Sequence, residues 1–364
     1  YSVAVSGTTA TVTLTKSAAT SVYDTMVEAL QYKNTHQDPS TGNSRVVTLT
    51  EIVDSGSNAG SNDNVSALSI ASTVTLAATN DAPTATAGTT LAYSENGTAA
   101  VVDNTIALSD ADDSQMAGAS VTISSGFTSG DILTFTDTAN ITGSYNSGSG
   151  VLTLSGSDTT ANYQAALRSI TYASSSEDPT TTATSRTISW TVTDGNSDGA
   201  GAETSTAVTS TINLTAVNDA PVTTAGATLA YSENGTAAVI DNTIALSDID
   251  DSQMAGASVT ISSGFTSGDT LGFTTIGAIS GSYNSSTGVL TLSGTDTIAN
   301  YQAALRSITY ASSSEDPTAT AASRTISWSV TDANSDGAGA QSSSAVTSTI
   351  NLTATNDTPT ATAG

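Results

Sequence analysis

The stretch Asn80-Asp81-Ala82-Pro83 returns twice along the chain, as Asn218-Asp219-Ala220-Pro221 and as Asn356-Asp357-Thr358-Pro359. The three copies are equally spaced in the sequence. Each copy follows an alternating run that is typical of a final β-strand, such as residues 211–217. Proline cannot donate to a sheet ladder, and Asn and Asp favour turns. We therefore interpret each copy as a joint between successive domains.

This period predicts how the 364 residues are organised. We expect the C-terminal part of a repeat in 1–79, full repeats in 80–217 and 218–355, and the start of a further repeat in 356–364. The two full repeats align without gaps and differ at 24 of 138 positions. Such similarity favours selection for length or uniform mechanics over distinct chemistry in each repeat, and we interpret the chain as part of a longer array.

Composition limits the partners. Only 11% of the residues are charged and 5% are aromatic, yet regularly spaced large apolar residues indicate thin packed cores rather than disorder. The net charge of −26 makes a nucleic acid an improbable partner, because phosphate binding needs clustered Lys and Arg. The chain has no cysteine, which rules out disulfides, and no apolar run long enough to cross a membrane, so we expect no membrane contact here.

Short alternating runs separated by Gly, Asn, Asp and Ser predict seven to nine antiparallel strands per repeat. Residues 146–150 have the composition of a hairpin loop. One segment breaks the alternation, because Tyr163, Ala166 and Leu167 form a helical stripe within 160–168, and residues 22–30 keep that stripe. The sequence thus predicts an all-β chain of tandem β-sandwich domains in a linear array, each with a short inserted helix.

Most catalytic arrangements are excluded by inventory. The full repeats contain no His, Cys or Lys, which excludes Ser-His-Asp and Cys-His nucleophiles, His/Cys zinc sites and lysine-dependent phosphate loops. His36, the single histidine, is best explained as a polar turn residue. A pair of carboxylates could still serve a glycosidase, but near-identical tandem copies argue against an enzyme.

The carboxylates lie in groups at the ends of predicted strands. Besides the joints, the groups in the first full repeat are Glu95, then Asp110, Asp112 and Asp113, then Asp194, Asn196 and Asp198. Any one group could simply make turns and cap loops. Several groups of hard oxygen ligands, repeated in register and without nitrogen or sulfur donors, favour Ca²⁺.

These motifs resemble cadherin repeats in content and in order. The joint 218–221 resembles the cadherin linker, Ser94-Glu95-Asn96 the early Glu-Asn motif, and Asp110-Ala111-Asp112 the Asp-Ala-Asp motif. The run 163–172 followed by Glu177-Asp178-Pro179 is typical of bacterial cadherin-like tandem repeats, which occur in giant surface adhesins. The resemblance covers essentially the whole chain and implies calcium bound at the joints.

Carried over position by position, the resemblance implies a ligand set for each joint. The joint at 80–83 would use Asn80, Asp81, Asp110, Asp112 and Asp194. The joint at 218–221 would use Glu95, Asn218, Asp219, Asp248, Asp250 and Asp332, and Glu233 would serve the following joint. The linker lacks two acidic or amide positions of a cadherin linker, and the Asp-Arg-Glu motif is reduced to Asp158 and Asp296. This implies one or two ions per joint.

The remaining side chains have structural interpretations. We expect Arg168, Arg186 and their copies Arg306 and Arg324 to form ion pairs with the nearby Glu177-Asp178 and its copy. We expect Trp190 and Trp328 to lie in the core rather than to stack on sugars.

The sequence therefore predicts a non-catalytic, extracellular structural rod, on a cell surface or secreted, that is stiffened by Ca²⁺ as the stalk of an adhesin or fibre. Its partners would be the neighbouring repeats of the same chain. The alternative is a self-assembling filament or surface-layer protein whose copies associate laterally, because small Ser, Thr and Ala faces permit close packing. A carbohydrate-binding module ranks last, since it lacks an aromatic platform.

Overall fold

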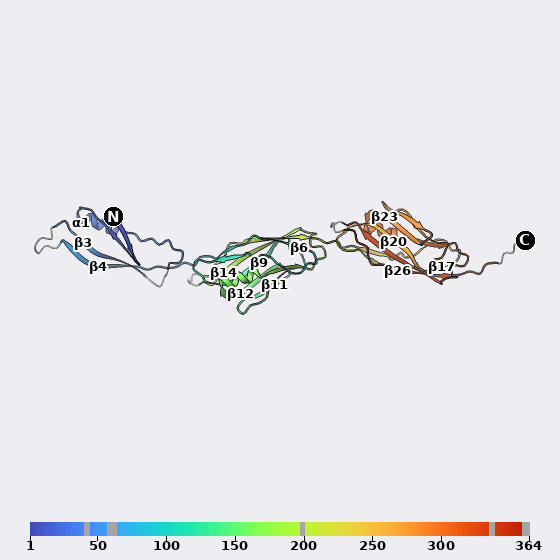
Figure 1. Ribbon diagram of the computed structural model, residues 1–364, viewed down its shortest axis with the longest axis horizontal. Coiled ribbons are helices and arrows are strands. Elements are labelled where there is room, and N and C mark those ends of the chain that lie inside the picture. Colours follow the sequence, from blue (N-terminus) through green and yellow to red (C-terminus); the bar gives the residue numbers. More distant parts are fainter. Residues whose placement is uncertain (40–43, 57–63, 197–200, 335–338, 359–364) are drawn as a thin grey trace.

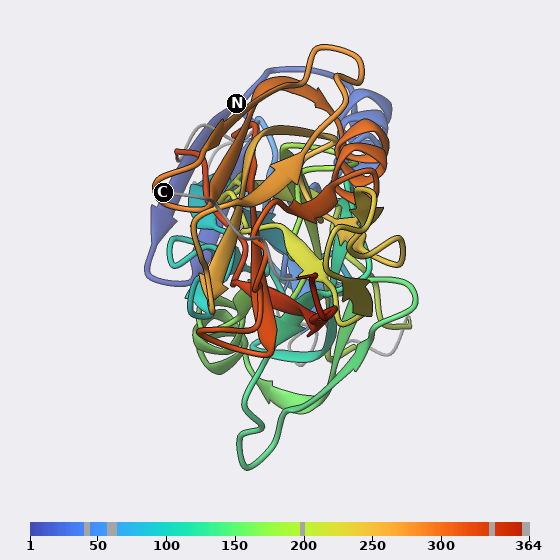
Figure 2. The same ribbon diagram turned by 90° about the vertical axis from the view of Figure 1, so that its right-hand side faces the viewer.

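Two β-sandwiches and an N-terminal segment lie end to end along the long axis of the protein (Figure 1). The structure is a computed structural model, and it describes residues 1–39, 44–56, 64–196, 201–334 and 339–358. The view along that axis shows the three parts behind one another (Figure 2). Asp198 and Pro359 lie outside the described residues. In the described part of the chain, no helix is long and apolar enough to cross a membrane.

The described residues of the first sandwich form eleven strands and one helix. They are β5 (Thr84–Thr86), β6 (Thr90–Ser94), β7 (Ala100–Val101), β8 (Ala107–Ser109), β9 (Gln115–Ser125), β10 (Asp131–Thr134), β11 (Thr142–Asn146), β12 (Val151–Thr159), α2 (Thr160–Arg168), β13 (Thr171–Ser174), β14 (Ser185–Asp194) and β15 (Val208–Thr215). The six-stranded sheet has the order β11-β12-β9-β14-β15-β6, the facing sheet has the order β10-β13-β7, and β5 pairs with β8. The expected seven to nine strands were too few, because the shortest strands leave little alternation to detect.

The second sandwich repeats this topology. Its elements are β16 (Val222–Thr224), β17 (Thr228–Ser232), β18 (Ala238–Val239), β19 (Ala245–Ser247), β20 (Gln253–Ser263), β21 (Asp269–Gly272), β22 (Ser280–Asn284), β23 (Val289–Thr297), α3 (Ile298–Arg306), β24 (Thr309–Ser312), β25 (Ser323–Asp332) and β26 (Val346–Thr353). The sheets are β17-β26-β25-β20-β23-β22, β18-β24-β21 and β16-β19. All-β tandem sandwiches with a short helix are thus confirmed.

One pairing contradicts the purely antiparallel expectation. The last strand β15 runs parallel to β6, with Thr211 opposite Thr90 and Thr215 opposite Ser94, and β26 pairs with β17 in the same way. Alternation along a strand reports which side chains face the core but carries no information on the direction of the neighbouring strand. The hairpin of β11 and β12 around residues 146–150 is antiparallel, as expected.

Each sandwich has its own hydrophobic core. Trp190 and Trp328 are fully buried, as expected, and donate through Nε1 to the hydroxyls of Ser210 and Ser348. The predicted helix is confirmed as α2, in which Tyr163, Ala166 and Leu167 face the core. The two cores draw on residues 93–214 and 231–352, and the domain boundaries themselves stay a prediction.

The N-terminal segment has no comparable core among its described residues. It contains β1 (Ser2–Ser6), β2 (Thr9–Thr13), α1 (Thr20–Glu28), β3 (Arg45–Val53) and β4 (Val65–Val74), paired as the hairpins β1–β2 and β3–β4. Most of the exposed large apolar side chains in the described residues belong to it. The stripe of residues 22–30 forms a helix here, but α1 buries none of its side chains.

Candidate metal centre

The joint between the sandwiches begins where β15 ends. Beyond the parallel pair, the Glu95 amide donates to Thr215 O at 2.9 Å, and the Val217 amide donates to the Glu95 carboxylate at 2.8 Å. The end of β6 is therefore fastened to the start of the linker. This places the Glu95 carboxylate, which is only 4% exposed, beside Asp219.

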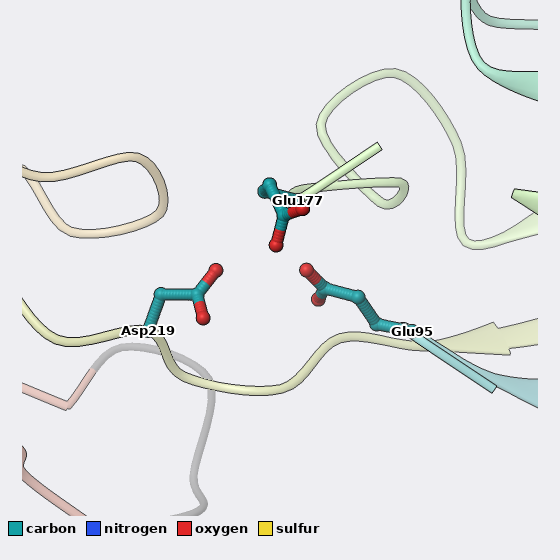
Figure 3. A group of neighbouring side chains, drawn as sticks. All are labelled: Glu95, Glu177 and Asp219. Carbon is teal, nitrogen blue, oxygen red and sulfur yellow. The ribbon is translucent and has the colours of Figure 1, made fainter. Parts of the chain in front are cut away.

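Three carboxylates converge on the first-sandwich side of this joint. Glu95, Glu177 and Asp219 each offer an oxygen within 4.8 Å of the others, and their carboxylates point toward one another (Figure 3). We call these three residues the outer cluster. Asn96 donates from its side-chain amide to Glu177 at 3.2 Å, which steadies the most exposed member.

Two members of the outer cluster, Glu95 and Asp219, have raised pKa values. Burial raises the pKa of Glu95 to about 7; the hydrogen bond from the Val217 amide opposes this shift, and the negative charges of Asp219, Glu177 and Asp250 reinforce it. Burial also raises the pKa of Asp219, again with the charges of Asp250 and Glu177. Such repulsion is relieved by protons or by a cation.

A second group of carboxylates belongs to the second sandwich. Asp248, Asp251 and Asp332 bring oxygens within 4.8 Å of one another, and we call them the inner cluster. Asp332 is fully buried at the end of β25 and accepts from Asn218 Nδ2 at 2.9 Å and from the Gln341 amide at 3.0 Å. The linker is thereby attached to the inner cluster.

Asp248 and Asp250 complete the connection. Asp248 Oδ1 accepts the amides of Asp250 and Asp251 at 3.2 and 2.9 Å, an Asx-turn that folds the loop back on itself. Asp250 accepts the Asp219 amide at 2.7 Å and so lies between the two clusters. Burial, together with the neighbouring Asp250 carboxyl, raises the pKa of Asp248 to about 7.

The joint at 80–83 repeats the hydrogen bonds between the linker and the following sandwich. Asn80 Nδ2 donates to the fully buried Asp194 at 2.8 Å, and the Asp81 amide donates to Asp112 at 2.9 Å. Asp110 and Asp112 gather with Asp113 within 4.8 Å. On the outer side Gln37 donates to Asp81 at 3.4 Å, in the place that Glu177 takes beside Asp219.

The outer geometry recurs at the end of the second sandwich. Glu233, Glu315 and Asp357 lie within 4.8 Å, and the Thr355 amide donates to Glu233 at 2.7 Å. This third copy lies at the expected following joint. It offers an internal comparison, since no inner cluster faces it within the described residues.

The donor set fits a hard cation. Glu95 Oε1, Asn218 Oδ1 and Asp248 Oδ2 are buried and accept no hydrogen bond from any residue that the structure describes, and Asn80 Oδ1, Asp110 Oδ2 and Glu233 Oε1 share this state. Buried oxygens without partners cost free energy unless something else satisfies them. Carboxylate and amide oxygens without nitrogen or sulfur donors are the ligands that Ca²⁺ prefers.

Comparisons with known proteins give limited likenesses. No family model matches the chain. A stretch of 128 residues is 35% identical to part of halomucin of Haloquadratum walsbyi. The match spans 34% of this chain but only 1% of the length of halomucin. Among solved structures, extracellular cadherin domains 1–5 of protocadherin gamma B2 overlap 81% of this chain and 44% of theirs, at a TM-score of 0.33 and 15% identity.

Mouse cadherin-23 EC22–24 is similar to the same degree. It covers 76% of this chain and 67% of its own, at a TM-score of 0.32 and 11% identity. Both scores are low, so the fold follows from the strand pairing described above and not from these likenesses.

Sequence reasoning missed Glu177, Glu315 and Asp251 as members of the clusters, and it grouped Asp113 with Asp110 and Asp112 without proposing it as a ligand. Glu177 lies in the loop between β13 and β14, far from Glu95 in the chain, and reaches it only through the fold. Its signal was present, since the run 177–179 recurs at the matching place of the next repeat, in 315–317. Asp113 and Asp251 directly follow the expected ligands Asp112 and Asp250 and could have been proposed as ligands on that ground alone.

The expected ion-pair partners of the arginines were wrong. Arg186 pairs with the buried Asp131 at 2.6 Å and Arg324 with Asp269 at 2.7 Å, not with the Glu-Asp runs, while Arg168 and Arg306 donate to the carbonyls of Ile106 and Ile244. Asp158 and Asp296 accept from Asn162 and Asn300 at the start of α2 and α3. Their helix-start position places them outside the carboxylate clusters of the described residues.

Proposed function

We propose that this chain is a non-catalytic section of an extracellular rod in which Ca²⁺ at the Asn-Asp-x-Pro joints fixes successive sandwiches to one another. Such a rod would serve as the stalk of a surface adhesin or fibre. One observation supports this most directly. At the joint 218–221, buried oxygens without partners come from the first sandwich (Glu95), the linker (Asn218) and the second sandwich (Asp248).

The physical basis is electrostatic. Glu95 and Glu177 belong to one sandwich, Asp219 to the linker, and Asp250 to the next sandwich, so their mutual repulsion acts across the joint. A divalent ion removes this repulsion and takes six to eight oxygens as ligands, which ties the two bodies together. Glu95, Glu177, Asp219 and Asp250 would hold one ion, and Asn218, Asp248, Asp251 and Asp332 a second.

The proposal is tested by melting and small-angle scattering in calcium and in chelator. At a calcium concentration 100-fold above the dissociation constant we expect about 2.7 kcal/mol of added stability, or a rise in Tm of about 10 °C. The maximum dimension should also become better defined, because the joint angle is fixed. Equal melting curves and equal dimensions in the two conditions would contradict the proposal.

Lateral self-assembly is the second candidate. The edge strands β11 (Thr142–Asn146) and β22 (Ser280–Asn284) carry no charged residue, and edges without charges are open to pairing with another chain. Ordered fibres of the purified chain in electron micrographs would support a filament or surface-layer protein. Rods that stay monomeric at high concentration would support the stalk.

A further inference from the structure

A buried row of polar side chains lies behind the outer cluster. The rings of Tyr93 and Tyr172 meet edge to face with centroids 5.0 Å apart, and Tyr172 donates its hydroxyl to Asp131 at 2.6 Å. Arg186 donates from Nε to the other oxygen of Asp131 at 2.6 Å. All four residues are at most 3% exposed, and we call them the buried polar row.

One end of the row holds the loop that carries Glu177. Arg186 donates from Nη2 to Pro179 O at 2.8 Å and from Nη1 to Ala183 O at 2.9 Å. These bonds fix the loop between β13 and β14 at a point just beyond Glu177. The planar guanidinium can serve Asp131 and both carbonyls at once, which a lysine cannot do.

The other end of the row holds the strand that carries Glu95. Tyr93 donates its hydroxyl to Gly97 O at 2.7 Å and accepts the Ser174 amide at 3.1 Å, so it braces the turn just beyond Glu95 and the end of β13. Glu95 and Glu177 are therefore each close in sequence to a carbonyl, of Gly97 or Pro179, that accepts a hydrogen bond from the buried polar row.

The second sandwich contains the same row. Tyr231 and Tyr310 meet at 5.0 Å, Tyr310 donates to Asp269 at 2.6 Å, and Arg324 donates to Asp269 at 2.7 Å and to Pro317 O at 2.9 Å. A buried ion pair is weak evidence for stability, because apolar replacements are often as stable. The Arg186–Asp131 and Arg324–Asp269 pairs also hold the loops that carry Glu177 and Glu315, which is a role other than stability.

We infer that Arg186 is a positioning residue for the outer cluster, holding Glu177 through Pro179 and, through Asp131, Tyr172 and Tyr93, holding Glu95 at the separation a divalent ion requires. Arg324 does the same for Glu233 and Glu315. This inference rests on the calcium function proposed above. Outer-sphere partners of this kind typically change metal affinity by about 10- to 100-fold.

The test compares Arg186→Lys with Arg324→Lys. Since the chain has no cysteine, spin labels can be placed at the exposed Ser144 and Ser282, one on each sandwich, by Ser→Cys substitution. The distance distribution between the labels is followed while CaCl2 is titrated. We expect Arg186→Lys to raise the calcium concentration at half-change by about tenfold or more.

Arg324→Lys is the matched control, because it makes the same change in the second sandwich, away from the joint 218–221. It should lower the melting temperature in chelator by as much as Arg186→Lys while leaving the half-change concentration within about twofold of the unsubstituted chain. Equal half-change concentrations for the two variants would overturn the inference. No response to calcium in the unsubstituted labelled chain would instead remove the proposed function, and the inference with it.

A second variant covers a failure of Arg186→Lys to fold. Tyr172→Phe removes only the hydroxyl on Asp131 and keeps the ring against Tyr93 and the Arg186–Asp131 pair. We expect a smaller rise in the half-change concentration, with Tyr310→Phe unchanged as its control. A Tyr172→Phe half-change equal to that of Tyr310→Phe would contradict the inference in the same way.

Discussion

Glu177 differs from its counterpart Glu315 in what stands opposite it. Glu177 lies with Glu95 beside Asp219, which also feels the charge of Asp250 across the joint, whereas Asp357, beside Glu315 and Glu233, has no such acid opposite it among the described residues. Glu177→Gln keeps the shape of the side chain and removes one ligand charge, and calcium affinity depends on that charge count. We expect about a tenfold loss of affinity at the joint 218–221, measured by calcium titration calorimetry.

Glu315→Gln is the control for this prediction and should leave that joint unchanged. The chain itself makes the exchange at its first joint, where Gln37 donates to Asp81. Gln37→Glu should therefore strengthen calcium binding there. An unchanged titration for Glu177→Gln would remove Glu177 from the proposed ligands.

Asp103 makes the stability of the first sandwich depend on pH. It lies near the N-terminal end of β6, away from Glu95. Burial would raise its pKa, but Oδ2 accepts the Ser210 hydroxyl at 2.6 Å and the Gly88 amide at 3.0 Å, and Thr105 adds two bonds to Oδ1, so its pKa is lowered well below the usual range. Its contribution to stability is present above about pH 4 and is lost as the pH falls through the folded pKa.

Asp103→Asn should therefore lower the stability of the first sandwich at pH 7 by about 1–3 kcal/mol and flatten its loss below about pH 4. Differential scanning calorimetry in chelator across the acid range measures both effects. Asp241→Asn should act in the same way on the second sandwich, where Asp241 accepts Ser348 at 2.7 Å and its pKa is likewise lowered. A steeper acid loss in Asp103→Asn than in the parent chain would contradict the assignment.

At this scale the position of each joint residue at a strand end could be predicted from the sequence, and its role as a metal ligand stays a prediction. The sequence could not predict the partner of Arg186, since Asp131 is remote in the chain and only the fold brings β10 and β14 together. The nearest acid in the chain was the wrong choice because adjacency in sequence does not place a side chain in the core.

Among the elements, α2 and α1 form a natural comparison. Tyr163 and Leu167 of α2 are fully buried, and Thr159 caps the helix by accepting the Asn162 amide at 3.2 Å. Tyr163→Ala or Leu167→Ala should cost about 3–5 kcal/mol through the cavity that remains. Val27 of α1 is 40% exposed, and Val27→Ala should cost less than about 1 kcal/mol. Urea unfolding curves separate the two, and similar losses at both sites would show that α1 packs on a core.

The elements were predicted where the alternation or the helical stripe is long enough to count. The long strands β9, β12 and β14 and the helix α2 fall in this class. The short strands β5 and β7, and the parallel direction of β6 beside β15, were not predictable, because they depend on tertiary pairing rather than on a local pattern.

For the whole molecule, the two cores share no residue and the described N-terminal segment contributes to neither. Its described side-chain contact with the joint 80–83 is the bond from Gln37 to Asp81. Deletion of residues 1–79 should therefore leave both melting transitions within about 2 °C of the parent chain, as checked by calorimetry. A larger drop in the first transition would show that the segment supports the first sandwich.

The linear array was predictable as a whole because the constant interval between the Asn-Asp-x-Pro copies is visible without any structure. The outer clusters were only half predictable. Glu95 and Asp219 belong to strand and linker motifs, whereas Glu177 comes from a loop that lies outside those motifs.

The parallel pair of β6 and β15 has a mechanical consequence. Tension along the rod enters β6 at its N-terminal end and leaves β15 at its C-terminal end, and in a parallel pair these ends lie at opposite ends of the ladder. The residue pairs from Thr90–Thr211 to Ser94–Thr215 are then loaded in shear, all together, instead of being peeled apart one at a time. Glu95 lies just beyond Ser94, and its carboxylate accepts the Val217 amide. This hydrogen bond therefore carries load together with the last residue pairs of the ladder.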